Sequence, residues 1–213
     1  GAEQALKKSI SLNPNYATAH QWLAEHYFIR GKFKSAHKEL DQAEELDPLS
    51  FITKLVRAHI YLSEKKYPES IKLVNRVLLI NPNMELANFI LINAYLGEKS
   101  YDKVLELASH LNIYQLSEFM KFRILISQGK INQARKFFQE LQTTLLEVAS
   151  TFPGALAIFY AELGDMDEAI KWYQKAIEHR DIVILSRYGL SRCDRLLNDP
   201  RVQEMLREVG LEE

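Results

Sequence analysis

The residues of this chain that could do chemistry are six histidines and a single cysteine. His20 and His26 are six positions apart, so they do not share a face of a helix, and with Glu25 they do not form the H-E-x-x-H pattern of a zinc enzyme. Cys193 has no histidine at a spacing that suggests a nucleophile and its base, so we expect a buried, inert thiol. The eight glycines occur singly, so no glycine-rich loop is present to cradle a phosphate. We therefore expect no catalytic residue, no metal site and no cofactor.

Charge and composition argue against nucleic acid and membrane as partners. The chain has 213 residues, with 27 basic and 28 acidic side chains and a net charge of −1, whereas a nucleic-acid surface needs a basic excess on one face. Its longest apolar runs, such as "GALAIFY" at 154–160, are far shorter than the roughly 20 residues that cross a bilayer. The single cysteine favours a reducing compartment. We therefore expect a cytoplasmic protein, or a periplasmic one if its parent is a membrane-anchored regulator.

Residues of the same type recur along the first half of the chain at intervals of 34. Three columns share this interval: Pro14, Pro48 and Pro82; Tyr27, Tyr61 and Tyr95; and Phe33, Tyr67 and Tyr101. A fixed period of this length is typical of stacked units that cannot bury their apolar faces alone. The sequence therefore predicts an array of small repeats.

Each repeat has the pattern of two helices joined by a short turn. In residues 17–47, apolar residues recur at helical spacing before Gly31 and again after it. Glycine is the residue type that most often ends a helix, and Pro48 stops the second helix. Three residues share one face of that second helix: Ala36, Leu40 and Ala43. The spacing thus predicts an all-α fold of helix hairpins.

The residues at the contacts of this hairpin resemble the tetratricopeptide repeat (TPR) family. The family's pattern of small and large residues is matched by Leu23, Ala24, Tyr27, Ala36, Leu40 and Pro48, although His20 takes the usual place of Trp. The resemblance implies a right-handed superhelical solenoid of antiparallel helix hairpins. It also implies a concave groove, lined by the first helices of successive repeats, that binds a protein or peptide partner.

The resemblance divides the chain into four segments. Residues 1–14 are the second helix of a truncated repeat, 15–114 are three repeats, and 115–180 are two diverged repeats. About four residues are missing from the register near "NIYQLS", so we expect the weakest interface between repeats there. Residues 181–213 are a C-terminal capping segment, in which "DP" at 199–200 predicts the start of a short helix.

The first helices carry the residues that we expect to line a protein-binding groove. The inward-facing positions of the family are occupied by Gln21, Trp22, Glu25, Leu55, His59, Phe89, Asn93, Phe119 and Arg123. Their side chains predict an apolar floor beside a polar line. The alternative is that some of them are buried against an adjoining helix or a neighbouring module.

Two hypotheses about function follow from these features. In the first, the chain is a non-catalytic scaffold that binds a protein segment in the concave groove, with no direct contact to nucleic acid or membrane. In the second, it is a regulatory or sensory C-terminal module of a bacterial transcription regulator or nucleotide cyclase, docked on an N-terminal effector domain of the same chain. The ending "NDPRVQEMLREVGL" resembles the C-terminal ending of TPR regions fused to such modules. An enzyme in its own right is poorly supported.

Overall fold

The computed structural model divides the chain into two compact units, Gly1–Leu111 and Asn112–Glu213. It describes residues 1–110, 114–149, 153–180 and 193–210, and within these ranges the side chains of 114–117 and 142–149 are not described. The boundary between the units falls in the stretch where the sequence predicts the weakest interface. Residues 111–113 of that stretch lie outside the described residues, so the weakness of this interface stays a prediction.

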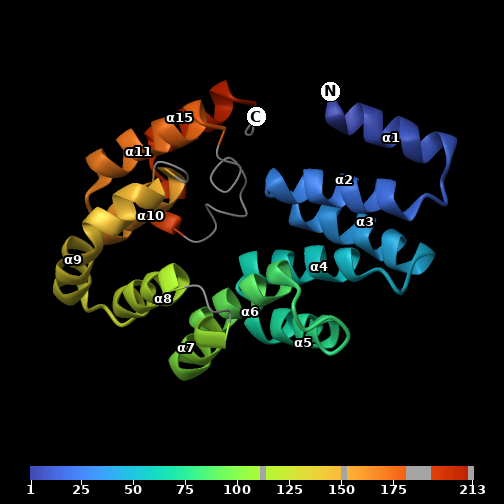
Figure 1. Cartoon of the computed structure of the whole chain (residues 1–213). Helices are drawn as coiled ribbons and strands as arrows, with labels where there is room; N and C mark the ends of the chain where they lie inside the picture. Colours follow the sequence, from blue (N-terminus) through green and yellow to red (C-terminus); the bar gives the residue numbers. More distant parts are fainter. Residues whose placement is uncertain (111–113, 150–152, 181–192, 211–213) are drawn as a thin grey trace. The chain divides into compact units, whose positions relative to one another are not determined.

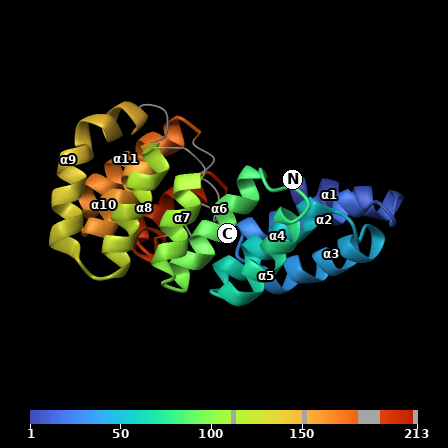
Figure 2. The ribbon, with the colours of Figure 1, turned by 60° about the horizontal axis from the view of Figure 1, so that its bottom comes forward.

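Unit 1 is a series of helix hairpins. Its described residues form α1 (Ala2–Leu12), α2 (Ala17–Ile29), α3 (Phe33–Leu46), α4 (Phe51–Ser63), α5 (Tyr67–Leu78), α6 (Glu85–Gly97) and α7 (Tyr101–His110). Each helix contacts the next one along the chain, and α2 lies beside α3 as α4 lies beside α5 (Figures 1 and 2). This order confirms the predicted helix hairpins. The division of residues 15–114 into three repeats, with α2, α4 and α6 as their first helices, stays a prediction.

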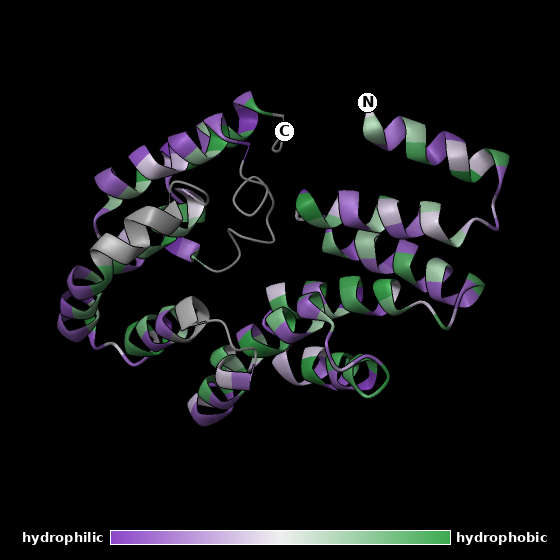
Figure 3. Cartoon of the chain, in the orientation of Figure 1, coloured by the Kyte–Doolittle hydropathy of each residue, from purple (hydrophilic) through white to green (hydrophobic). Residues whose placement is uncertain are grey.

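Small residues stand where these helices touch. Ala24 on α2 and Ala36 on α3 are both fully buried, as the repeat pattern predicts. Leu40 fills the space beside them and is also fully buried. Figure 3 shows hydrophobic and hydrophilic residues interspersed along the helices. Buried apolar side chains of neighbouring helices, from α2 to α7, form the core of unit 1.

The turns inside the hairpins share one backbone geometry. Gly31 has a φ of 69° and Gly164 has a φ of 87°, a left-handed conformation that glycine adopts without a steric cost. Lys65 and Lys99 occupy the same place in the next two repeats and have a φ of 61°. The hydrogen bonds that follow are equivalent. The Lys66 amide donates to the Tyr61 carbonyl at 2.8 Å, and the Lys32 amide, one residue after Gly31, donates to the Tyr27 carbonyl at 2.9 Å. Two repeats therefore hold a lysine in a strained conformation.

We predict that Lys65→Gly stabilises unit 1. A side chain in the left-handed region costs roughly 1–2 kcal/mol, and the greater flexibility of glycine in the unfolded chain offsets part of the gain. The free energy of unfolding should rise by about 0.5–1 kcal/mol in a urea titration. Lys72→Gly is the matched control, because Lys72 is exposed within α5 and glycine there should be destabilising by a similar amount. A loss of stability in both variants would contradict the prediction.

Unit 2 continues the hairpin pattern and ends in two shorter helices. Its described residues form α8 (Tyr114–Ser127), α9 (Ile131–Ala149), α10 (Pro153–Leu163), α11 (Met166–Glu178), α14 (Asp194–Leu197) and α15 (Pro200–Glu208). Helix α9 has 19 residues and continues well past Leu141, where the repeat pattern places its last matched residue. The reason is local, because no proline or glycine interrupts residues 131–149.

The end of the chain packs on the last hairpin. Asp199 caps α15, as predicted, since its carboxylate accepts a hydrogen bond from the Arg201 amide at 2.9 Å. Val202 and Leu206 of α15 join the buried cluster that contains Ala169 and Tyr173 of α11. An ion pair of 2.9 Å between Arg201 and Asp167 also links the two helices. Helices α14 and α15 thus cover the apolar surface of α10 and α11.

Candidate protein-interaction surface

The first helices of unit 1 lie next to one another. Helix α2 contacts α4, and α4 contacts α6. Residues at equivalent positions of these helices therefore form rows that run across the repeats, one residue from each helix. Whether such a row can meet a partner depends on how much of each side chain its neighbours leave exposed.

Helix α2 places its three predicted residues at different depths. Gln21 is buried, and its amide donates a hydrogen bond of 2.8 Å to Glu25. Glu25 is half-buried, and this burial raises the pKa of its carboxyl, although the Gln21 hydrogen bond acts in the opposite direction. Trp22 is 50% exposed, which is unusual for so large an apolar side chain. Trp22 and part of Glu25 are therefore accessible.

Helix α4 buries both of its predicted residues. Leu55 is fully buried among Ala58, Val74 and Ala87, and His59 is 3% exposed. The His59 ring lies 5.5 Å from the ring of Phe28 on α2. For these two residues the burial alternative holds, because α4 packs between α2 and α6. Leu55 and His59 therefore contribute to packing between the helices and add almost no accessible surface.

Helix α6 contributes one partly accessible residue. Phe89 is half-buried and packs against the cluster that contains Leu55 and Ile90. Asn93 is 7% exposed, and its side-chain amide donates a hydrogen bond of 2.8 Å to the Phe89 carbonyl. Asn93 therefore binds its own helix, and only Phe89 has appreciable surface.

The two predicted residues of unit 2 lie together on α8. The guanidinium of Arg123 is 5.9 Å from the centre of the Phe119 ring, which is within the range of a cation–π contact. Phe119 also meets Phe159 of α10 edge-on at 5.1 Å. Burial lowers the pKa of Arg123, and the carboxyl of Glu162 partly compensates for this effect. Phe119 and Arg123 are both half-buried and have contacts within unit 2.

Two exposed residues of the same row were missing from the predicted set. Ile52 on α4 is 42% exposed and Leu86 on α6 is 44% exposed. Ile52 and Leu86 stand at the second position of their repeats. Trp22 stands at the sixth position of its repeat, one helical turn further along, so it lies on the corresponding side of α2 although not at the equivalent position. Counting repeat positions could have found them. We call Trp22, Ile52 and Leu86 the exposed row.

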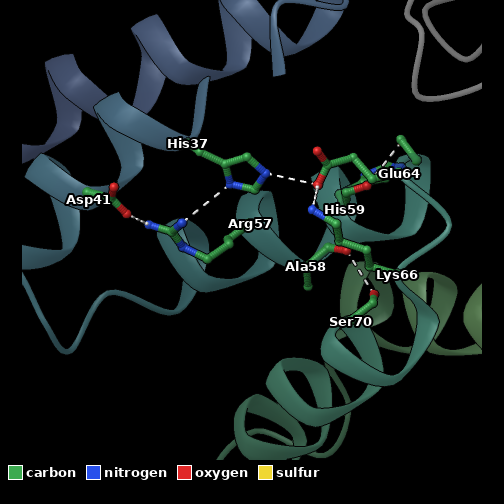
Figure 4. Close-up of polar contacts among 9 residues, drawn as sticks. His37, Asp41, Arg57, Ala58, His59, Glu64, Lys66 and Ser70 are labelled. Atoms are coloured by element: carbon green, nitrogen blue, oxygen red, sulfur yellow. Dashed lines mark hydrogen bonds and ion pairs between the residues drawn. The ribbon is translucent and has the colours of Figure 1, made fainter. Parts of the chain in front are cut away.

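A second unpredicted feature is a polar network between α3 and α4 (Figure 4). Arg57 replaces an apolar residue of the repeat pattern and is 8% exposed. Its guanidinium binds Asp41 and Glu44, each at 2.8 Å. Burial alone would lower the pKa of Arg57, but the hydrogen bonds to Glu44 and Asp41 raise it above its usual value. This network joins the first two repeats and leaves Arg57 no role in binding a ligand.

Two of the side chains that were considered for chemistry, His20 and Cys193, lie in the packed interior of the protein. His20 contacts Glu39 at 2.8 Å and the Pro14 carbonyl at 3.2 Å, which ties α2 to its flanking elements. Cys193 is buried, as expected, and burial raises the pKa of its thiol to about 11. A thiol with this pKa is almost entirely protonated at neutral pH and is a poor nucleophile.

Metal centres and membrane spans are two further kinds of functional feature, and the described residues include neither. Across those residues, His, Cys, Asp and Glu side chains nowhere gather in threes in a way that could hold a metal ion. The described helices also include none with the length and apolar character needed to cross a membrane.

The comparison with protein families agrees with this architecture. Residues 154–179 match the model of the tetratricopeptide repeat, and they cover the α10–α11 hairpin with its left-handed glycine turn. Residues 154–179 are therefore a tetratricopeptide repeat, and the helix hairpins in the rest of the described chain support a tetratricopeptide repeat protein. The TPR hairpins of both units have the adjacent-helix packing of this family, whose repeats serve as protein-interaction modules. A search of the curated proteins found no match. The resemblance of the C-terminal tail to bacterial regulators stays a prediction.

Proposed function

We propose that this TPR protein is a non-catalytic interaction module that binds a protein segment along the exposed row of unit 1. The observation that carries the proposal is the exposure of Trp22, Ile52 and Leu86, at 50%, 42% and 44%, on first helices that contact one another in sequence. Apolar side chains that stay exposed together in a folded protein commonly mark a contact site. Half-buried Phe89 on α6 adds an aromatic side chain of the type that anchors such interfaces.

The buried predicted residues have a supporting role in this proposal. Leu55 packs in the cluster that joins α4 to α6, and the His59 ring contacts Phe28 on α2, so the positions of α2, α4 and α6 depend on them. A rigid base lowers the entropy that a surface loses on binding, which favours affinity. Phe119 and Arg123 belong to unit 2, and we propose a partner contact there only for their exposed parts.

A double variant of the exposed row should weaken partner binding strongly. We expect Ile52→Asp with Leu86→Asp to weaken binding by at least about tenfold, because two charges would have to be desolvated at the interface. A photo-reactive amino acid at position 22 would first cross-link the partner in a lysate of the source cells. The captured protein would then be purified and its affinity for each variant measured by calorimetry.

The matched control uses exposed apolar residues elsewhere in unit 1. Leu79 and Ile80, after the end of α5, are 83% and 68% exposed, and Leu79→Asp with Ile80→Asp should leave the affinity unchanged. Circular dichroism should be the same for both double variants. If the control weakens binding as much as the exposed-row variant does, or if neither has an effect, the proposed surface is wrong.

A further inference from the structure

The two tryptophans of the chain differ in what stands three residues after them. Trp172 on α11 is followed by Lys175, whose ammonium lies 4.2 Å from the centre of the indole ring. Residues three apart on a helix are neighbours on its surface, so this cation–π contact is made within one turn. Trp22 on α2 has Glu25 at the same spacing, and no cation of the described residues lies over its ring. A carboxylate thus stands where the other tryptophan has a cation.

Glu25 also differs from the other half-buried carboxylates of unit 1. Glu44 has Arg57 at 2.8 Å, and Glu64 has Lys66 at 3.1 Å. Among the described residues, no basic side chain lies within ion-pair distance of Glu25, whose hydrogen bond comes from the neutral Gln21 amide. That bond uses the Oε1 atom, and the carboxylate can accept further bonds through Oε2. Burial without a compensating charge raises the pKa of this carboxyl.

We propose that Trp22 and Glu25 form a binding site for a single cationic side chain, Arg or Lys, of the partner segment. The cation sits against the exposed indole face and pairs with the carboxylate, which combines a cation–π contact with an ion pair in one place. The apolar part of the same segment continues over Ile52 and Leu86. This inference rests on the proposed function, because it names the chemistry that the exposed row recognises.

The charge of the neighbouring first helices favours a cation over an anion. Around the exposed row, the half-buried Glu25 is charged, and the exposed Trp22, Ile52 and Leu86 and the half-buried Phe89 are apolar. An acidic segment would be repelled by Glu25, and an entirely apolar segment would leave the carboxylate desolvated with no counter-charge. A segment with one cation and adjacent apolar side chains would pair with the Glu25 carboxylate and also cover the apolar residues of the exposed row.

A pair of short peptides that differ in one charge tests this proposal. The first places a single arginine beside leucines, and its twin replaces the arginine with citrulline, which has nearly the same shape and no charge. Binding is followed by the NMR signal of the Trp22 indole N–H, assigned by its absence in Trp22→Phe. We expect a saturable shift, and a Kd at least about tenfold lower for the arginine peptide than for the citrulline peptide.

Variants of the protein identify the carboxylate involved. Glu25→Gln should raise the Kd of the arginine peptide about tenfold and leave that of the citrulline peptide unchanged. Glu45→Gln, on the exposed side of α3, is the matched control and should change neither value. If wild-type protein binds both peptides equally at Trp22, the cation site is refuted while apolar docking on the exposed row stands. If neither peptide shifts the Trp22 signal, both the cation site and the proposed surface fail.

Discussion

Phe159→Ala should lower the free energy of unfolding of unit 2 by about 3–5 kcal/mol, because it removes the centre of an aromatic cluster. The Phe159 side chain is 2% exposed, and its ring lies 4.4 Å from Phe122, 5.3 Å from Phe138 and 5.1 Å from Phe119. These residues come from α8, α9 and α10, so the cavity would weaken two helix interfaces at once. Truncating a ring in such a place costs both its apolar burial and the contacts of the atoms that faced it.

Unfolding of unit 2 can be measured separately from that of unit 1. In a Trp22→Phe background, Trp172 on α11 is the remaining tryptophan, so its fluorescence in a guanidinium titration reports unit 2. Val209→Ala is the control, since Val209 is 42% exposed and its truncation should cost only a small fraction as much. A loss for Phe159→Ala no larger than for Val209→Ala would mean that the aromatic cluster is not part of the core.

The second large effect is expected from Ala169→Leu. Ala169 of α11 is fully buried in the cluster that contains Ala157 and Ala161 of α10, so the two helices meet through small side chains. A leucine there must displace the facing helix, and overpacking of this kind costs about 1–3 kcal/mol. The melting temperature of unit 2 should fall clearly, as judged by the same Trp172 signal.

Glu178→Leu on the same helix separates overpacking from a general effect of added apolar volume. Glu178 is exposed at the end of α11, so a leucine there has no facing helix to displace. Its melting temperature should stay close to that of the parent protein. Equal melting of the parent, Ala169→Leu and Glu178→Leu would show that the small residues of the repeat are not at the helix contact.

The sequence by itself determined where the turns of the hairpins fall and which residues share a helix face, although the repeat pattern did not show that α9 continues past Leu141. Gly31 and Gly164 mark turns because a positive φ favours glycine, and Asp199 with Pro200 marks the start of α15 because a carboxylate and a proline both suit a helix N-terminus. The period of 34 identifies the hairpins, since the same contacts recur in each repeat. These features are local, and local backbone chemistry is readable from residue types.

Only the tertiary structure decided which residues of the predicted surface are accessible. Periodicity places Leu55 and Trp22 on the same side of their helices, but it does not say how deeply the adjoining helices cover that side. Leu55 is fully buried because α4 has first helices on both sides, whereas Trp22, Ile52 and Leu86 stay 50%, 42% and 44% exposed. The buried Arg57 with its two carboxylates likewise depends on contacts that form between helices when the repeats stack.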